Sequence, residues 1–298
     1  MNGFLNLLKP PGMTSSDAVV QIRRTLPKGV KVGHAGTLDP EAAGVLPIMV
    51  GKAARLFDVL TEKEKEYVAE IAFGASTDTQ DAQGTVVERS ARLPDLSEVE
   101  AVLPRFIGNI LQVPPAYSAL KVNGKTAYDL ARSGETVELA PRPARVDSIE
   151  CLERMGPDSL LLRVRCGKGV YIRTLCHDIG RAVGCPAHMR FLLRTQSGVF
   201  TLEQAVTLET WTEKEDRTPL LMRMDEPLAH LPMARVGGQQ KKAVLSGSPL
   251  TVFEEIDETV RKGGLVRVYC GDVFAGLGRW QGEALRFQAM LMEQEESV

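Results

Sequence analysis

The sequence predicts an α+β fold divided into two domains. With 298 residues, 44% of them apolar, the chain is long enough to bury a large core and to form more than one domain. Strand-like apolar runs and amphipathic helical segments are mixed without a steady strand–helix–strand alternation, which favours α+β over a doubly wound sheet. A Gly-punctuated, strand-rich stretch follows Leu228–Pro232. We therefore expect a large domain at 1–230 and a small β domain at 231–298.

The first hundred residues predict strands interrupted by short helices. Apolar or alternating runs predict strands at 3–8, 45–50, 66–73 and 85–88. Helices are expected at 14–26, 52–60 and 96–108, the first of them because Thr and Ser caps follow a Pro-Pro-Gly turn.

The middle of the chain predicts further strands around one longer helix. An extended segment from 112 leads to a turn at Asn123-Gly124 and to a short helix that Gly134 ends. Strands are expected at 145–152, 159–166 and 188–194, and a helix at 170–183 has an apolar stripe that leaves Arg173 and Arg181 to one side. The acidic stretch 203–228 has no clear pattern.

Composition argues against several classes of protein. No apolar run approaches the roughly 20 residues that a membrane-spanning helix needs. The N-terminus lacks the basic and apolar regions of a secretory signal. Five cysteines without a Cys-x-x-Cys pair are expected to be reduced thiols rather than zinc ligands. We therefore expect a cytoplasmic protein with no membrane association.

Charge is distributed unevenly along the chain. The net charge is −2, yet 21–55 holds six Lys and Arg residues against two acids, and 163–194 holds seven against one. A local basic face on a nearly neutral protein can bind phosphates. Random surface clustering explains the same counts equally well.

A single carboxylate stands out in the stretch GHAGTLDPEAAGVLPIMVG at 33–51. Asp39 lies in a tight loop directly before Pro40, which favours an extended backbone at Asp39 and would hold its side chain rigidly at a cleft. The alternative is an Asp that only stabilises its own turn. His34 could form a dyad with Asp39, but no Ser or Cys in an elbow motif completes a triad.

A second candidate cluster lies in RVRCGKGVYIRTLCHDIG at 163–180. The glycines around Lys168 could present N–H groups to a phosphate at the start of a helix, although the P-loop pattern is missing. Arg173 could bind a carboxylate through two hydrogen bonds and lower the pKa of that acid. The alternative for Arg173 is a surface ion pair of little value.

Two further features are less specific. Tyr67 begins an expected strand, where it could stack on a planar base or simply be a half-buried strand residue. Asp78 and Asp81 in TDTQDAQG suggest calcium ligands, but the EF-hand pattern fails because the closing Glu is absent. We interpret that loop as turn structure and leave a substrate-facing position open.

Five motifs within residues 1–230 stand in an order that is specific to one family. They are KPPGMTSSDAV at 9–19, GHAGTLDPEAAGVLPI at 33–48, KEYVAEIAFGASTDTQDAQG at 65–84, VPPAYSALKVNGKTAYDLARSG at 113–134 and GKGVYIRTLCHDIG at 167–180. Together they closely resemble the bacterial tRNA pseudouridine-55 synthases of the TruB type. LSGSPL and FAGLGR resemble a PUA RNA-binding domain more weakly. The resemblance implies a mixed-sheet pseudouridine synthase catalytic domain followed by a small β-rich PUA-like domain.

The resemblance also implies roles for individual residues. Asp39 falls on the family's nucleophile, Arg173 on the Arg that pairs with it, and Tyr67 on the Tyr that stacks on the target uracil.

Three more residues would contact the substrate by the same resemblance. Tyr171 falls on a second active-site Tyr, His34 on the His that fills the space left by the extruded base, and Leu192 on a Leu that closes the pocket.

The implied activity is isomerisation of uridine 55 in the tRNA T loop to pseudouridine with base flipping. No cofactor, metal or obligatory protein partner is implied, whereas the T-arm of tRNA is the expected partner. A covalent bond from Asp39 to C1′ and a glycal route both stay open, as does an accompanying tRNA-folding role. Two competing hypotheses are a non-enzymatic RNA binder or chaperone, and a metal-dependent hydrolase using His34, Asp39, Asp78 and Asp81.

Overall fold

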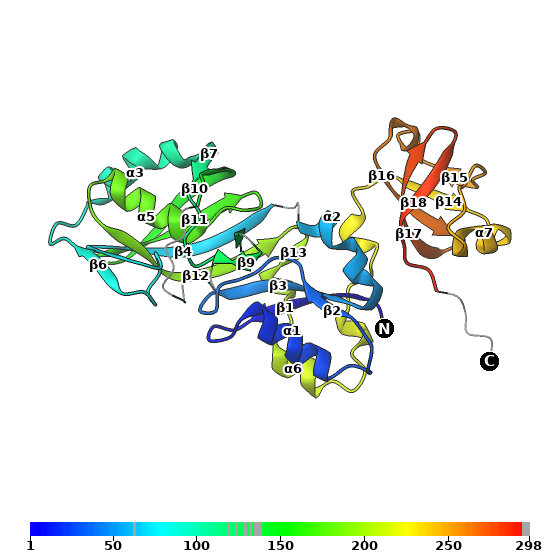
Figure 1. Cartoon of the computed structure of the whole chain (residues 1–298), viewed down its shortest axis with the longest axis horizontal. Helices are drawn as coiled ribbons and strands as arrows, with labels where there is room; N and C mark the ends of the chain where they lie inside the picture. Colours follow the sequence, from blue (N-terminus) through cyan, green and yellow to red (C-terminus); the bar gives the residue numbers. More distant parts are fainter. Residues whose placement is uncertain are drawn as a thin grey trace.

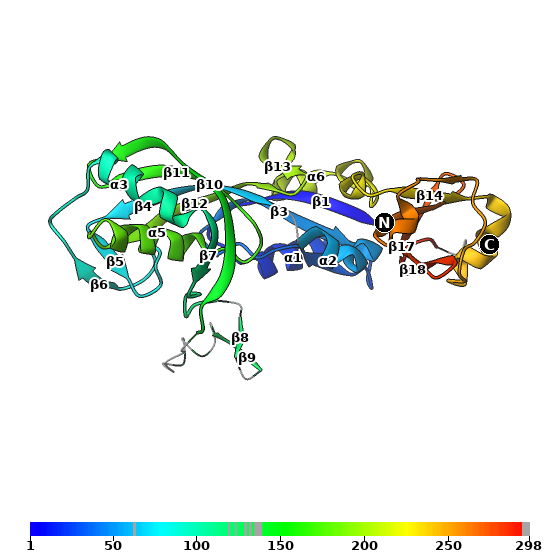
Figure 2. The same ribbon diagram turned by 90° about the horizontal axis from the view of Figure 1, so that it is seen from above.

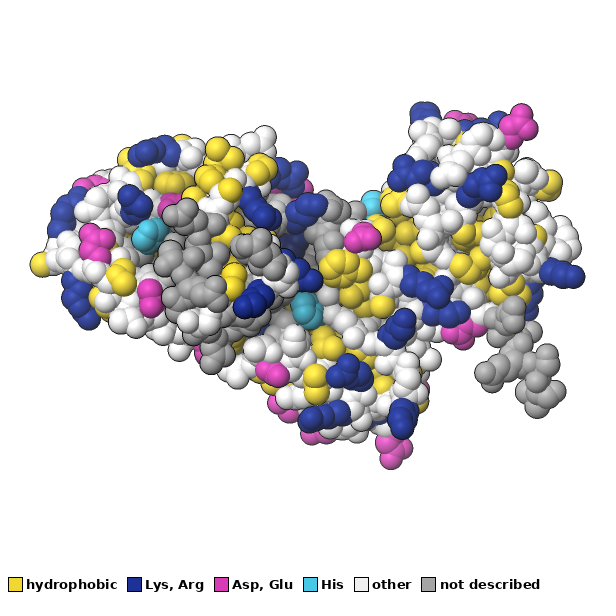
Figure 3. All heavy atoms as spheres, viewed as in Figure 1, with side chains coloured by type: hydrophobic (Ala, Val, Ile, Leu, Met, Phe, Trp, Pro, Cys, Tyr) yellow, Lys and Arg dark blue, Asp and Glu magenta, His cyan; other side chains and the backbone are white. Residues whose placement is uncertain are grey.

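A computed structural model describes residues 1–61, 64–118, 120–122, 124–127, 130, 133 and 139–293. The chain forms an elongated molecule with two parts (Figures 1 and 2). A large mixed sheet with helices takes up most of the chain, and a five-stranded sheet forms the C-terminal end. The space-filling view shows Lys and Arg side chains around the middle of the large part on one face, and others on the C-terminal part (Figure 3).

The large sheet has nine strands in the order β1-β3-β12-β4-β11-β10-β7, with β2 paired to β3 and β13 to β12. The sheet is mixed because β12 runs parallel to β3 and antiparallel to β4. The strands are β1 Gly3–Lys9, β2 Val32–His34, β3 Ala43–Val50, β4 Lys65–Phe73, β7 Gly108–Gln112, β10 Arg142–Gly156, β11 Ser159–Cys166, β12 Ala187–Ser197 and β13 Phe200–Thr201. A separate hairpin joins β5 Ala75–Thr77 to β6 Val86–Arg89. The predicted α+β class is confirmed.

Short helices cover the sheet and begin at the caps that the sequence offers. They are α1 Ser15–Arg24, α2 Phe57–Thr61, α3 Leu96–Val102 and α5 Ile172–Ala182. Thr14 caps α1 and Asp95 caps α3, each within a capping box that satisfies two N–H groups at the helix start. No helix in the described part of the chain is long and apolar enough to cross a bilayer.

Most predicted elements are present, with shifted ends. The helix expected at 52–60 is a 3₁₀ segment, η1 Gly51–Leu56, followed by α2. The helix expected at 96–108 changes to 3₁₀ at η2 Leu103–Phe106, where Pro104 lacks the N–H that an α-helix needs, and 108 already belongs to β7. β8 Lys121–Val122 pairs antiparallel with β9 Lys125–Thr126 on either side of the predicted turn, of which Asn123 lies outside the described residues. The short helix expected before Gly134 falls largely outside the described residues.

The acidic stretch 203–228 folds back on the N-terminal strand. It contains η3 Leu202–Gln204, α6 Leu208–Glu213, η4 Thr218–Leu220 and η5 Glu226–Leu228. Isolated bridges join Leu7 to Val206 and Phe4 to Met222. Trp211 is fully buried, and its Nε1 donates to Oγ1 of Thr25 at 2.8 Å. This stretch therefore packs as part of the large body.

The C-terminal part is a separate sheet in the order β15-β14-β16-β17-β18. Its elements are β14 Met233–Val236, η6 Gly238–Gln240, α7 Lys241–Leu245, β15 Glu255–Ile256, η7 Val260–Lys262, β16 Leu265–Cys270, β17 Val273–Gln281 and β18 Ala284–Met290. The pairing of β17 with β18 requires glycine at 276, because its φ is 141° and a Cβ there would lie 2.0 Å from the carbonyl oxygen of Ala289. The expected β-rich C-terminal region is confirmed.

Candidate active site

The loop between β2 and β3 carries Asp39 and is held by side chains from the first motif. Oγ of Ser15 accepts from the N–H of Leu38 at 2.9 Å and donates to its carbonyl at 3.1 Å. Nζ of Lys9, which is fully buried, donates to the carbonyl of Pro40 at 2.9 Å. Both neighbours of Asp39 are therefore fixed, and the carboxylate has little freedom to move.

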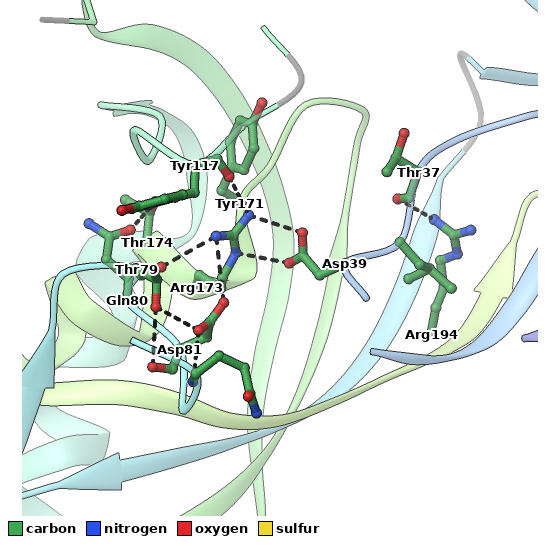
Figure 4. Close-up of polar contacts among 12 residues, drawn as sticks. Thr37, Asp39, Thr79, Gln80, Asp81, Tyr117, Tyr171, Arg173, Thr174 and Arg194 are labelled. Atoms are coloured by element: carbon green, nitrogen blue, oxygen red, sulfur yellow. Dashed lines mark hydrogen bonds and ion pairs between the residues drawn. The ribbon is translucent and has the colours of Figure 1, made fainter. Parts of the chain in front are cut away.

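Asp39 and Arg173 form an ion pair, as Figure 4 shows. Nε of Arg173 lies 2.8 Å from Oδ2 of Asp39, and Nη2 donates to Oδ1 at 3.0 Å. A guanidinium that binds both oxygens of one carboxylate fixes its orientation as well as its charge. The two side chains come from residues 134 positions apart in the chain.

Arg173 is buried rather than lying on the surface, in the first turn of α5. Only 6% of its side chain is exposed, against 32% for Asp39. Two backbone carbonyls also accept from it, that of Tyr117 at 3.0 Å and that of Thr79 at 3.3 Å. The alternative of a weak surface ion pair is therefore wrong for Arg173.

A second carboxylate, Asp81, approaches the same guanidinium. Its Oδ2 lies 3.6 Å from Nη1 of Arg173, while its Oδ1 accepts from Thr79 Oγ1 at 2.6 Å and from Gln83 N at 3.0 Å. The β5–β6 loop turns at Gln80, which has φ 64°. The interpretation of this loop as turn structure is confirmed, but sequence reasoning missed the contact of Asp81 with Arg173.

Burial dominates the charge state of Asp39. It raises the pKa of the carboxyl above its usual value, and the charge of Asp81 adds to this rise, whereas Arg173 opposes it. Lys9 lowers the pKa as well, to a smaller degree. The expectation that pairing with Arg173 would give a net fall in the pKa is therefore wrong, since removal of the carboxylate from water outweighs the pair.

Two tyrosines border this pair. Tyr67 lies on β4 with 7% of its surface exposed. Burial raises the pKa of its hydroxyl, and the charge of Asp39 acts in the same direction. Tyr171 stands directly before α5, where the side-chain amide of Gln112 accepts from its N–H at 3.0 Å and donates to its carbonyl at 3.1 Å. Burial raises the pKa of Tyr171 too, and Asp39 again adds to the rise.

His34 and Leu192 lie near the site but do not bind Asp39. Within the described residues, the buried Nδ1 of His34 has no hydrogen-bond partner, and the hydrogen bonds and ion pairs found for the Asp39 carboxylate are with Arg173, so no His34–Asp39 dyad is formed there. Burial and the nearby charge of Arg194 lower the pKa of His34, which favours the neutral ring. Leu192 on β12 is 6% exposed and belongs to the same apolar cluster as Tyr67.

The basic segment 163–194 does not form a free basic face. Arg163, Arg165 and Arg190 each bind a carboxylate, at 2.9, 2.7 and 2.6 Å respectively. Arg173 and Arg194 are buried. Most of its charges therefore have protein partners or are buried, and contact of this segment with an RNA backbone stays a prediction.

The cysteines and acids of the chain do not gather into a recognisable metal site. All five cysteines are free thiols. Across the residues that the structure describes, no three His, Cys, Asp or Glu side chains come together in a way that could hold a metal ion.

Comparison with known proteins identifies the family of this chain. Residues 23–172 match the model of the TruB family pseudouridylate synthase N-terminal domain, and 173–229 match that of the tRNA pseudouridylate synthase B C-terminal domain. The protein named tRNA pseudouridine synthase B from Alkaliphilus oremlandii is 42% identical over 281 residues, which is 93% of either chain. Its namesake from Azoarcus sp. is 40% identical over 296 residues, covering 99% of this chain and 96% of its own.

Solved structures agree with the fold. A chain from the structure of an H/ACA RNP bound to a substrate RNA containing 2′-deoxyuridine has a TM-score of 0.72 at 28% identity, with 98% of this chain and 85% of that chain covered. A chain of a Cbf5-Nop10-Gar1 complex has a TM-score of 0.71 at 30% identity, with 98% and 84% covered. The chain therefore belongs to the TruB family of pseudouridylate synthases and is an isomerase.

Proposed function

We propose that this chain converts uridine 55 in the T loop of tRNA to pseudouridine, with Asp39 as the nucleophile. The observation that carries the proposal is the two-point contact between Arg173 and Asp39, beside Tyr67, in a chain of this family. The name shared by its relatives, tRNA pseudouridine synthase B, supports tRNA as the substrate.

The reaction is an isomerisation whose atoms balance without a co-reactant. The N1–C1′ bond of uridine breaks, the uracil turns, and C5 forms a new bond to C1′. C5 then loses its proton and N1 gains one, so no electrons, phosphate or water are consumed. Such a reaction requires an ionised carboxylate at the ribose and a pocket that retains the free uracil, and it has no need of a metal or cofactor.

Asp39 and Arg173 would act together in the first step. The carboxylate would either attack C1′ or act on the ribose to give a glycal, and both routes need it ionised. Partial burial disfavours the ionised form, so the Arg173 guanidinium would retain the charge, above all once bound substrate excludes water from the site.

Tyr67 and three further residues would hold the substrate. The ring of Tyr67 would stack on the freed uracil, as aromatic side chains do on unpaired bases. The base has to leave its stack, at an expense of a few kcal/mol. The neutral ring of His34 would occupy the vacated space, while Tyr171 and Leu192 would line the pocket.

The T-arm of tRNA is the proposed partner, and the phosphate contacts would come from the last turn of α1 and the segment that joins it to β2. Arg23, Arg24, Lys28 and Lys31 are exposed, and no ion pair is found for them within the described part of the chain. Exposed cations of this kind bind RNA phosphates and make affinity depend on salt. The domain at 231–298 would add RNA contacts as a PUA-like module.

We propose that the enzyme works in the cytoplasm without an obligatory protein partner. Every side chain proposed for the site comes from this one chain, and all five cysteines are free thiols, which suits a reducing compartment. The titles of the solved neighbours name further proteins in their complexes, and that property belongs to those assemblies.

Release of the C5 proton tests the proposal. Transcribed tRNA carrying tritium at C5 of uridine should lose label to water when incubated with the protein, and Asp39→Asn should abolish the release. Asp78→Asn is the matched control, because Asp78 sits in the β5–β6 loop and only binds the N–H of Thr85. Release that survives Asp39→Asn would contradict the proposal, and release that EDTA abolishes and a divalent ion restores would favour the hydrolase hypothesis.

A further inference from the structure

Arg194 is a buried cation for which the reaction described above has no use. It lies on β12 with 1% of its surface exposed, among the largest fully buried side chains of the protein. In the described part of the chain, no carboxylate lies within ion-pair distance of its guanidinium. Burial of a charge without an ionic partner is strongly unfavourable unless hydrogen bonds compensate for the lost water.

The compensation comes from backbone carbonyls on both arms of the loop that carries Asp39. Nε of Arg194 donates to the carbonyl of Val45 at 2.7 Å, after Asp39 in the chain. On the other side of Asp39 in the chain, Nη2 donates to the carbonyl of Gly36 at 3.1 Å and Nη1 donates to the carbonyl of Thr37 at 3.4 Å. Figure 4 shows Arg194 beside Thr37, on the side of Asp39 away from Arg173.

The backbone of β12 approaches the same loop. β12 pairs in parallel with β3, and Arg194 stands opposite Gly44. Gly44 has φ 112°, and a Cβ at this position would lie 2.2 Å from the carbonyl oxygen of Arg194. Only glycine permits this close approach. The backbone of Arg194 therefore holds the end of the Asp39 loop, and its side chain holds the beginning of the same loop.

The same guanidinium also acts on Tyr67. In the pairing of β12 with β4, Arg194 stands directly opposite Tyr67. Its positive charge lies close enough to the Tyr67 hydroxyl to oppose the rise in the pKa that burial causes. One buried group therefore holds the loop of the proposed nucleophile and stands beside the residue proposed to hold the uracil.

We propose that Arg194 is a positioning residue that fixes the Asp39 loop and the Tyr67 ring relative to one another. The inference rests on the proposed roles of Asp39 and Tyr67. A guanidinium suits this task because its planar fork directs several N–H groups to separate acceptors, whereas the Lys ammonium offers one compact charge. Reacting groups displaced by about 1 Å react more slowly by roughly a hundredfold, even when the substrate still binds.

Arg194→Lys tests the proposal, because it keeps the charge and loses the fork. We expect the single-turnover rate at saturating tRNA to fall by between about tenfold and a hundredfold. The Kd for tRNA should stay within about twofold, since Arg194 is buried and touches no phosphate. Arg190→Lys is the matched control on the same strand, where an exposed Arg pairs with Glu70 and Asp158. It should keep the wild-type rate.

A second control separates the effect of lower stability from the effect of lost positioning. Ile22→Val removes one methyl from a fully buried side chain of α1 and should lower Tm without changing the rate at 25 °C, in a protein that stays folded. A folded Arg194→Lys protein with the wild-type rate overturns the proposal, as does a loss of affinity equal to the loss of rate.

A variant on the loop side keeps the test decisive if Arg194→Lys does not fold. Gly36 has φ 111° and its carbonyl accepts from Arg194, so Gly36→Ala should displace that carbonyl and lower the rate without weakening tRNA binding. A folded Gly36→Ala protein with full activity would overturn the proposal. Asp39→Asn assayed in parallel separates the two claims, because activity in that variant would refute the nucleophile assignment, not the role of Arg194.

Discussion

Arg173 is held in place independently of the carboxylate that it binds. Besides its contacts with both oxygens of Asp39, its guanidinium donates to the backbone carbonyls of Tyr117 and Thr79. Carbonyls do not change charge during a reaction, so Arg173 would keep its orientation through the change in the charge of Asp39 that the proposed attack on the ribose requires. This is the preorganisation that makes a buried charge effective in catalysis.

Loss of Arg173 should impair catalysis far more than binding. In Arg173→Ala, the buried Asp39 carboxylate loses its partner while no phosphate contact is lost. We expect the single-turnover rate to fall by about a hundredfold or more, and the Kd for tRNA, measured by filter binding, to change by less than about threefold. Arg163→Ala, which breaks an exposed pair with Glu150, is the control. Equal losses of rate and affinity would show that Arg173 binds RNA instead.

The pH dependence of kcat/KM should report the charge of Asp39. In the proposed mechanism only the ionised carboxylate is active, so we expect kcat/KM to rise as pH passes the pKa of Asp39, which burial places above 3.8. Asp81 raises this pKa; Asp81→Asn should therefore move the acid limb to lower pH, while Arg173→Ala moves it to higher pH. Asp78→Asn should leave the limb in place. A limb that does not respond to Asp81 would mean that another group limits the rate.

Lys9 should make the protein more stable as pH rises above neutrality. Burial lowers the pKa of Lys9 from 10.5 to about 8, so between these values the unfolded chain binds more protons at this site than the folded chain. The free energy of unfolding from this site therefore increases with pH across that window, by roughly 3 kcal/mol at about 1.4 kcal/mol per pH unit. Urea titrations at pH 7 and pH 10 should show this increase in the wild type relative to Lys9→Met. An equal change in the free energy of unfolding between the two pH values in the wild type and in Lys9→Met would contradict this prediction.

The sequence predicts the strands and the pairing of Asp39 with Arg173 better than it predicts how the pair is surrounded. Asp39 and Arg173 lie in motifs whose residue types are distinctive, and alternation along 66–73 matches β4 because one face of that strand is buried. For Asp81 the sequence indicates turn structure and leaves a substrate-facing position open. It does not indicate the contact with Arg173, which depends on how the β5–β6 hairpin folds against the large sheet. The direction of the Asp39 pKa was misjudged because burial depends on the whole fold.

Arg194 is a second residue whose surroundings the sequence does not predict. On charge counts it belongs with the basic residues of 163–194 that suggest phosphate binding, yet it is the most deeply buried of them. Only the register of β12 against β3 and β4 turns it inward, toward Gly36 and Tyr67. The periodicity of apolar residues does not determine that register, because it depends on the pairing of three strands that lie far apart in the chain.

The segment 203–228 should stabilise the large body without affecting its chemistry. Trp211 is fully buried and bonds Thr25 at the end of α1. Trp211→Ala should reduce the free energy of unfolding by about 3–5 kcal/mol, and Thr25→Val by about 1 kcal/mol. Turnover at a temperature where the variants are folded should match the wild type. A Tm unchanged in Trp211→Ala would contradict this packing.

Removal of 231–298 should weaken tRNA binding and leave a folded catalytic body. The C-terminal part is tied to that body by few polar contacts, among them Tyr269 to Asp225 at 2.9 Å and Lys52 to the carbonyl of Met292 at 3.0 Å. It also covers apolar side chains such as Phe4 and Leu228, so some loss of stability is expected. Circular dichroism and filter binding of 1–230 give the readouts. Wholesale aggregation of the truncated chain would argue against a boundary at 230.

Mass-resolved mapping of modified uridines in a transcribed tRNA, after incubation with the wild type and with Asp39→Asn, tests the central claim most directly. Because pseudouridine has the mass of uridine, the map is read after a chemical adduct marks the new base. The account predicts one modified position, uridine 55 of the T loop, with the wild type, and none with Asp39→Asn in a protein that still binds tRNA. Modification at position 55 by Asp39→Asn at the wild-type rate would contradict it.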